Sequence, residues 1–83
     1  MPVVFVLDVA EFKPVLDALA VNEDAEISGP SAGYWSVRSD GELALNRKRS
    51  GIGLALWYSS LAGGYIGDIA QFDRDDIRIR DCG

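Results

Sequence analysis

The stretch of sequence that decides the fold is residues 50–64, Ser-Gly-Ile-Gly-Leu-Ala-Leu-Trp-Tyr-Ser-Ser-Leu-Ala-Gly-Gly. Its apolar residues alternate as in a strand, but they also recur at the three- and four-residue spacing of one helix face. The ends favour a helix, because Ser50 suits an N-cap and the pair Gly63-Gly64 suits a C-terminus. Gly53 weakens such a helix by about 1 kcal/mol relative to alanine. The helical stripe would consist of Leu54, Trp57, Tyr58 and Leu61.

A second helical stripe lies near the N-terminus, directly after a run of β-branched and aromatic residues. This run covers residues 2–7 and predicts a strand that is buried on both faces. Asp8 and Glu11 then form a capping-box pattern, and Pro14 is tolerated in the first turn of a helix. We therefore expect a helix that begins near Glu11 and ends near residue 21. Its core-facing stripe would be Phe12, Val15, Leu16 and Leu19.

The middle of the chain predicts a β-hairpin around Asp40-Gly41. An Asp-Gly pair between two alternating runs suits a type I′ turn, which needs positive φ at both central residues. The hairpin would join residues 34–38 to residues 42–47. Residues 22–32 before it are expected to be mostly loop, with residues 26–28 as a candidate for a short extended piece.

Two further strands are expected after the second helix. They would span residues 65–72 and residues 77–80, with Gly67 marking a bulge or a close approach of another backbone. The elements then follow in the order β-α-β-β-α-β, with a short extra C-terminal strand. This order predicts one α+β domain, residues 1–83, of the ferredoxin-like type, in which two helices cover one face of an antiparallel sheet. Such a fold does not by itself indicate a function.

Composition argues against several classes of protein. With 13 acidic and 8 basic residues the net charge is −5, which disfavours binding to nucleic acid. No apolar run is long enough to span a bilayer, and the N-terminus lacks the basic region of a secretory signal. The single cysteine, Cys82, excludes an internal disulfide. We expect a cytoplasmic protein that binds neither nucleic acid nor a membrane.

The residue types also make a catalytic or metal centre hard to build. The chain contains no histidine, so neither a Ser-His nor a Cys-His pair can be assembled from it. Asp73, Asp75 and Asp76 resemble the beginning of a calcium loop, but the glycine and the closing glutamate of that loop are missing. We therefore expect no metal and no cofactor.

The first candidate site is a basic run in this otherwise acidic chain. If a helix begins at Ser50, the run lies at its N-terminus, where free N–H groups and the helix dipole favour a small anion. The alternative is a solvated turn that keeps the edge of the hairpin from aggregating. The run consists of Arg47, Lys48, Arg49, Ser50 and Gly51.

Asp68 is the second candidate, because it interrupts an apolar strand. Pointing inward, its carboxylate would be desolvated and its pKa raised, as a general base requires; pointing outward, it would be an ordinary surface residue. The alternation of the strand does not decide between the two. An inward Asp68, together with an anion site at Arg47–Ser50, would suit a small-molecule-binding or isomerase-like enzyme.

Five aromatic residues are candidates for an interface. Neighbours in sequence diverge in direction on a strand or a helix, so one member of each adjacent pair is expected to be exposed. Exposed aromatics on a small domain often mark an interface, although they equally well fill its core. The five are Tyr34, Trp35, Trp57, Tyr58 and Tyr65. The function these observations favour is a small interaction or accessory module without catalytic activity, which forms a homodimer or binds a protein partner.

Overall fold

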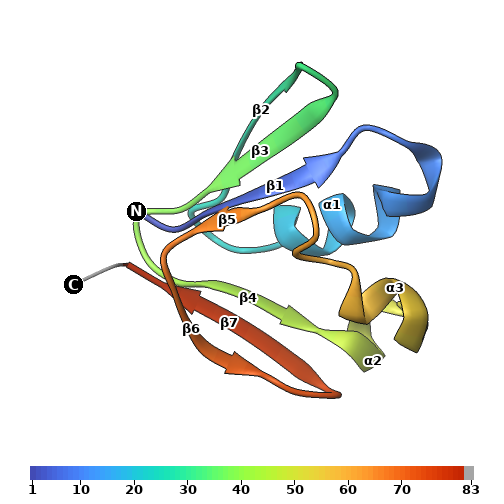
Figure 1. Cartoon of the computed structure of the whole chain (residues 1–83). Coiled ribbons are helices and arrows are strands. Elements are labelled where there is room, and N and C mark those ends of the chain that lie inside the picture. Colours follow the sequence, from blue (N-terminus) through green and yellow to red (C-terminus); the bar gives the residue numbers. More distant parts are fainter. Residues whose placement is uncertain (82–83) are drawn as a thin grey trace.

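The computed structural model describes residues 1–81 and contains two antiparallel sheets (Figure 1). In strand order, the first sheet consists of β2 (Glu26–Ser31), β3 (Tyr34–Arg38), β1 (Val3–Leu7) and β5 (Tyr65–Ile66), and the second of β4 (Leu43–Asn46), β7 (Asp76–Arg80) and β6 (Asp68–Phe72). The helices are α1 (Lys13–Ala20), preceded by a 3-10 turn at Ala10–Phe12, α2 (Arg47–Ser50) and α3 (Leu54–Tyr58). The α+β class with antiparallel strands is confirmed. The single sheet is wrong, and the ferredoxin-like arrangement is not reproduced in detail.

β1 is the strand predicted for residues 2–7, but only one of its faces is fully buried. Val4 and Val6 point into the core and lie opposite Val37 and Trp35 of β3. The alternate residues of β1 are half-buried on the outer face of the first sheet. The expected burial on both faces is wrong because α1 covers only the inner face (Figure 1).

The predicted hairpin around Asp40-Gly41 is wrong. β3 pairs with β1 and β2, whereas β4 pairs with β7 in the other sheet. Buried Ser39 fixes the crossing between the sheets, since its N–H donates to the Pro2 carbonyl and its hydroxyl accepts from the Gly41 N–H. The hairpin that does form joins β2 to β3 through Ala32 and Gly33, both at positive φ. β2 begins at the short extended piece considered for residues 26–28 and continues to Ser31, through residues expected to be loop.

The strand predicted for residues 65–72 is divided between the two sheets at Gly67. β5 pairs with β1, and β6 pairs with β7. Gly67 adopts φ +133°, and a Cβ there would lie 2.5 Å from the carbonyl oxygen of Arg80. The close backbone approach is confirmed. The last predicted strand is also confirmed, as β7, which lies at the centre of the second sheet.

The first helix is largely as predicted, except at its start. Val15 and Leu19 are buried, and the other two residues of the predicted stripe pack against the core. The capping box is wrong, because Val9 lies before the 3-10 turn and no side chain caps it. The Asp8 carboxylate instead accepts a hydrogen bond of 3.0 Å from Nε1 of Trp35.

The helix expected from residue 50 is replaced by two short helices. Asn46, not Ser50, caps the first of them, since its Oδ1 accepts from the Arg49 N–H at 2.9 Å. Gly51, at φ +72°, ends α2, and α3 begins three residues later. Residues 50–62 join neither sheet, but of the predicted stripe only Trp57 is buried.

One core unites the two sheets, α1 and α3. Its buried residues come from both sheets and from both helices, so neither sheet has a core of its own. No helix within residues 1–81 is long and apolar enough to cross a membrane. Cys82 lies outside the described residues. The core residues are Val4, Val6, Val15, Leu19, Val37, Leu43, Leu45, Ile52, Trp57, Ile77 and Ile79.

Candidate functional site

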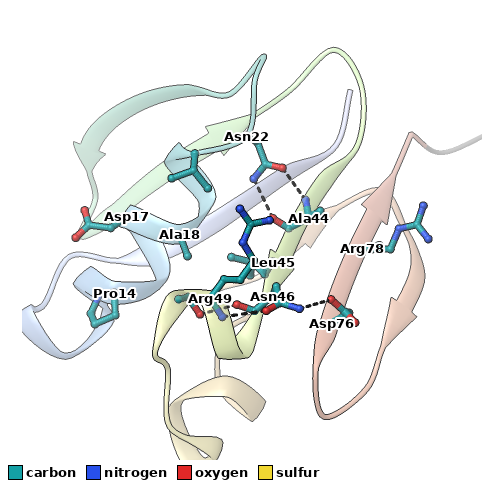
Figure 2. A pocket seen from close by; sticks show the side chains of 12 residues that line it. Pro14, Asp17, Ala18, Asn22, Ala44, Leu45, Asn46, Arg49, Asp76 and Arg78 are labelled. Atoms are coloured by element: carbon teal, nitrogen blue, oxygen red, sulfur yellow. Dashed lines mark hydrogen bonds between the residues drawn. The ribbon is translucent and has the colours of Figure 1, made fainter.

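A hollow of about 850 Å³ lies where α1, β4 and α2 meet the outer face of the second sheet (Figure 2). One wall is the exposed side of α1, which contributes Pro14, Asp17 and Ala18. The opposite wall comes from the end of β4, from α2 and from the outer side of β7. Arg49 and Ser50 of the predicted anion site both line it, and we describe it as the α1–β4 hollow.

Asn22 fixes the two walls of the hollow relative to each other. Its Nδ2 donates to the carbonyl of Ala44 at 3.0 Å, and its Oδ1 accepts from the Ala44 N–H at 3.0 Å (Figure 2). The same Nδ2 also donates to the carbonyl of Leu19 at 2.9 Å. The side-chain amide thus pairs with the edge of β4 as a neighbouring strand would, which satisfies backbone groups that an edge strand otherwise leaves open.

Replacing Asn22 with alanine is expected to lower the free energy of unfolding by about 1–2 kcal/mol, because three hydrogen bonds in a partly exposed site are lost. Urea denaturation measures the change, and faster hydrogen exchange of the Ala44 amide would locate it. Glu23→Ala, an exposed neighbour, is the control and is expected to stay within about 0.5 kcal/mol of the wild type. Equal stabilities of the two variants would show that Asn22 does not join the walls.

Each charged side chain that lines the hollow, except that of Arg49, has an ion-pair or hydrogen-bond partner within the described residues. Asp17 lies 3.5 Å from Nζ of Lys13, and Asp76 accepts from Nδ2 of Asn46 at 2.9 Å. Arg78 is bound to Glu42, as described below. Within residues 1–81 the guanidinium of Arg49 has no carboxylate within ion-pair distance, and its side chain extends across the hollow toward Asn22 and Ala44 (Figure 2).

Glu42 connects two arginines on the outer face of the second sheet. Its carboxylate accepts from Nε and Nη2 of Arg78 at 2.7 and 3.2 Å and from Nε of Arg80 at 3.3 Å. The hydrogen bond from Arg78 is the main reason that the pKa of Glu42 lies below its ordinary value, although partial burial opposes the change. The pKa of Arg78 is raised by the same contact.

This carboxylate is expected to make stability depend on pH. Because the folded pKa of Glu42 lies below the unfolded one, its contribution is complete above the unfolded value, about 4.3, and is lost as the pH falls through the folded value. The difference in unfolding free energy between the wild type and Glu42→Gln should therefore be positive at pH 7 and shrink below about pH 4. Urea denaturation at pH 7, 4 and 3 checks this. A difference that does not change with pH would contradict it, and Glu23→Gln is the matched control.

The residues predicted to hold an anion do not form the cradle that was expected. Arg47 donates from Nε to the carbonyl of Arg74 at 2.9 Å, and the Ser50 hydroxyl donates to the Asn46 carbonyl at 2.8 Å. Ser50 ends α2, so the helix N-terminus expected there is wrong. Lys48 and Gly51 are exposed outside the hollow. Anion binding by this group stays a prediction.

Asp68 is exposed on β6, where it lies opposite Arg80 of β7. Its side chain is on the outer, polar face of the second sheet and is not enclosed by apolar groups. The desolvation that a general base at this position would need is therefore missing.

The five predicted interface aromatics do not form one patch. Trp57 is fully buried, and its Nε1 donates to the carbonyl of Asp73 at 2.7 Å, so an interface role for it is wrong. Trp35 is half-buried beside Asp8. Tyr34 and Tyr65 are exposed on opposite faces of the first sheet, and Tyr58 stacks on Phe72 of β6. The aromatic residues are dispersed because the small core buries Trp57, its largest side chain, and because the strand register places Tyr34 and Tyr65 on opposite faces of the first sheet.

Sequence reasoning missed Asn22, since an asparagine at the end of a helix carries no signal of the strand edge it will meet.

No group of three or more Cys, Asp or Glu side chains within the described residues is arranged to hold a metal ion.

Comparison with known proteins identifies a similar fold. No protein-family model matches the sequence, and no curated protein sequence matches it. A solved chain from the structure of the complex of phenol hydroxylase with its regulatory protein superposes with a TM-score of 0.78. The alignment covers 95% of this chain and 95% of that one at 16% sequence identity, so the two share a fold over almost their whole lengths. The matched chain of that complex is the regulatory protein.

Proposed function

We propose that this chain is a small cytoplasmic regulatory protein, without catalytic activity of its own, that acts by docking on a larger enzyme of the phenol hydroxylase kind. The observation that carries the proposal is the superposition over 95% of both chains on a protein solved in complex with phenol hydroxylase.

The surface of the molecule supports a docking role more than a catalytic one. Its one candidate general base, Asp68, is exposed. The α1–β4 hollow offers small apolar side chains and an arginine without an acidic partner in the described chain, which are features of a protein-binding surface.

Self-association belongs to the same proposal. Tyr34 and Ile66 are 38% and 54% exposed on the outer face of the first sheet, beside half-buried side chains of β1. The longest helix, α1, packs on the opposite, inner face (Figure 1). A second copy would bury them. Sedimentation velocity should then show a concentration-dependent dimer at tens of micromolar, and a monomer at every concentration would contradict this part of the proposal.

The test of docking uses the hydroxylase of the organism that makes this chain. Isothermal titration calorimetry should show saturable binding, and addition of the chain should change the rate of substrate hydroxylation several-fold. An unrelated acidic protein of similar size, added at the same concentration, serves as the control. If the chain neither binds nor changes the rate, the proposed function is wrong.

A further inference from the structure

We infer that the α1–β4 hollow is the docking surface, and that it receives an amphipathic helix of the partner whose carboxylate pairs with Arg49. This inference rests on the proposed function, and it names the surface and the chemistry of the partner segment that the function requires.

The apolar part of the surface is one face of α1 and of the residue that follows it. Pro14 and Ala18 of α1 and the C-cap residue Val21 are spaced at i, i+4 and i+7, so they lie on one side of the helix, the side that lines the hollow. Val21 is 82% exposed, although it is a large apolar residue. The apolar side of a second helix can pack against an exposed apolar face of this kind.

The charge of the hollow selects the partner. Of the two arginines that line the hollow, Arg78 is bound to Glu42, whereas Arg49 has no carboxylate within ion-pair distance in residues 1–81 of a protein whose overall charge is −5. An arginine pairs best with a carboxylate, which it binds through two parallel hydrogen bonds. The incoming helix therefore carries an aspartate or glutamate beside its apolar face.

A helix fits the hollow, and an added strand does not. Strand addition needs open N–H and C=O groups on the edge of β4. Those of Ala44 are already bonded to the side chain of Asn22. The partner must meet this wall through side chains, as a helix lying in a groove does.

The test compares charge reversals at two adjacent positions that change net charge equally. Arg49→Glu should weaken binding to the hydroxylase at least tenfold, whereas Lys48→Glu, exposed and outside the hollow, should weaken it less than threefold. Val21→Asp and Ala20→Asp form a second pair, because both positions are exposed but only Val21 lines the hollow. Val21→Asp should lower the affinity at least fivefold, and Ala20→Asp less than twofold. Circular dichroism and thermal unfolding confirm that each variant is folded.

The outcomes separate this inference from the function it rests on. Equal losses within both pairs would show a general effect of charge and would overturn the docking surface, while binding by the wild type upholds the proposed function. Failure of the wild type to bind overturns both.

Discussion

Replacing Trp57 with alanine is expected to lower the free energy of unfolding by about 3–5 kcal/mol. The indole is fully buried where residues from both sheets meet α3, so its removal leaves a cavity in the one core that unites them. Its Nε1 also donates to the Asp73 carbonyl, which loses its partner. Total stability for 83 residues is about 4–12 kcal/mol, so the substitution should remove a large fraction of it.

Urea denaturation followed by far-ultraviolet circular dichroism measures this effect. Tyr58→Ala is the matched control, since Tyr58 follows on the same helix but is 58% exposed. It loses mainly its stacking on Phe72, about 0.5–1.5 kcal/mol. Trp57→Phe should fall between the two, because it keeps most of the volume and loses the hydrogen bond. If Trp57→Ala were no more harmful than Tyr58→Ala, the place of Trp57 in the core would be wrong.

Replacing Gly67 with alanine is expected to have a similar effect, about 3–5 kcal/mol, through the backbone. The new Cβ would lie 2.5 Å from the Arg80 carbonyl oxygen and 3.0 Å from Cγ2 of Ile79, at φ +133°. Relief of the overlap requires β5, β6 or β7 to move, and this residue is where the chain passes from one sheet to the other.

Alanine substitutions at two other glycines distinguish the effect of steric overlap at Gly67 from the effect of its positive φ. Gly33→Ala adds strain alone, since φ is +85° and no atom lies within 4 Å of the new Cβ, and should cost about 1 kcal/mol. Gly41→Ala adds neither and should change stability by less than about 0.5 kcal/mol. Thermal unfolding ranks the three variants, and any other order would contradict the described geometry at Gly67.

The parts of the fold that were predictable are those fixed by local pattern. The strand at Val3–Leu7 follows from a continuous run of β-branched and aromatic residues, and the helix at Lys13–Ala20 follows from the helical spacing of its apolar residues. The hairpin failed because turn chemistry does not identify which strands pair. Asp40-Gly41 has the better turn sequence, yet the hairpin turn lies at Ala32-Gly33, where alanine takes φ +53°.

The division of residues 65–72 between the two sheets also shows that local sequence does not identify which strands pair. Gly67 predicts either a bulge or a close approach of another backbone, but the atom it approaches belongs to Arg80, and nothing near Gly67 in sequence reveals that. The candidate site was found in part, since Arg49 and Ser50 do line the hollow. Asn22 was missed because its role is set by the Ala44 backbone, which only the tertiary structure brings beside it.

The central place of β7 in the second sheet governs when this protein can fold during synthesis. β4 has no neighbouring strand in its sheet other than Asp76–Arg80, and β6 pairs with the same segment. A nascent chain that has released residues 1–70 from the ribosome can hold α1 and the β2–β3 hairpin, but it cannot yet assemble the second sheet. Closure of so long a span is slower than pairing of adjacent strands. Assembly of the second sheet therefore waits until Asp76–Arg80 can pair, and until then neither β4 nor β6 has its neighbouring strand.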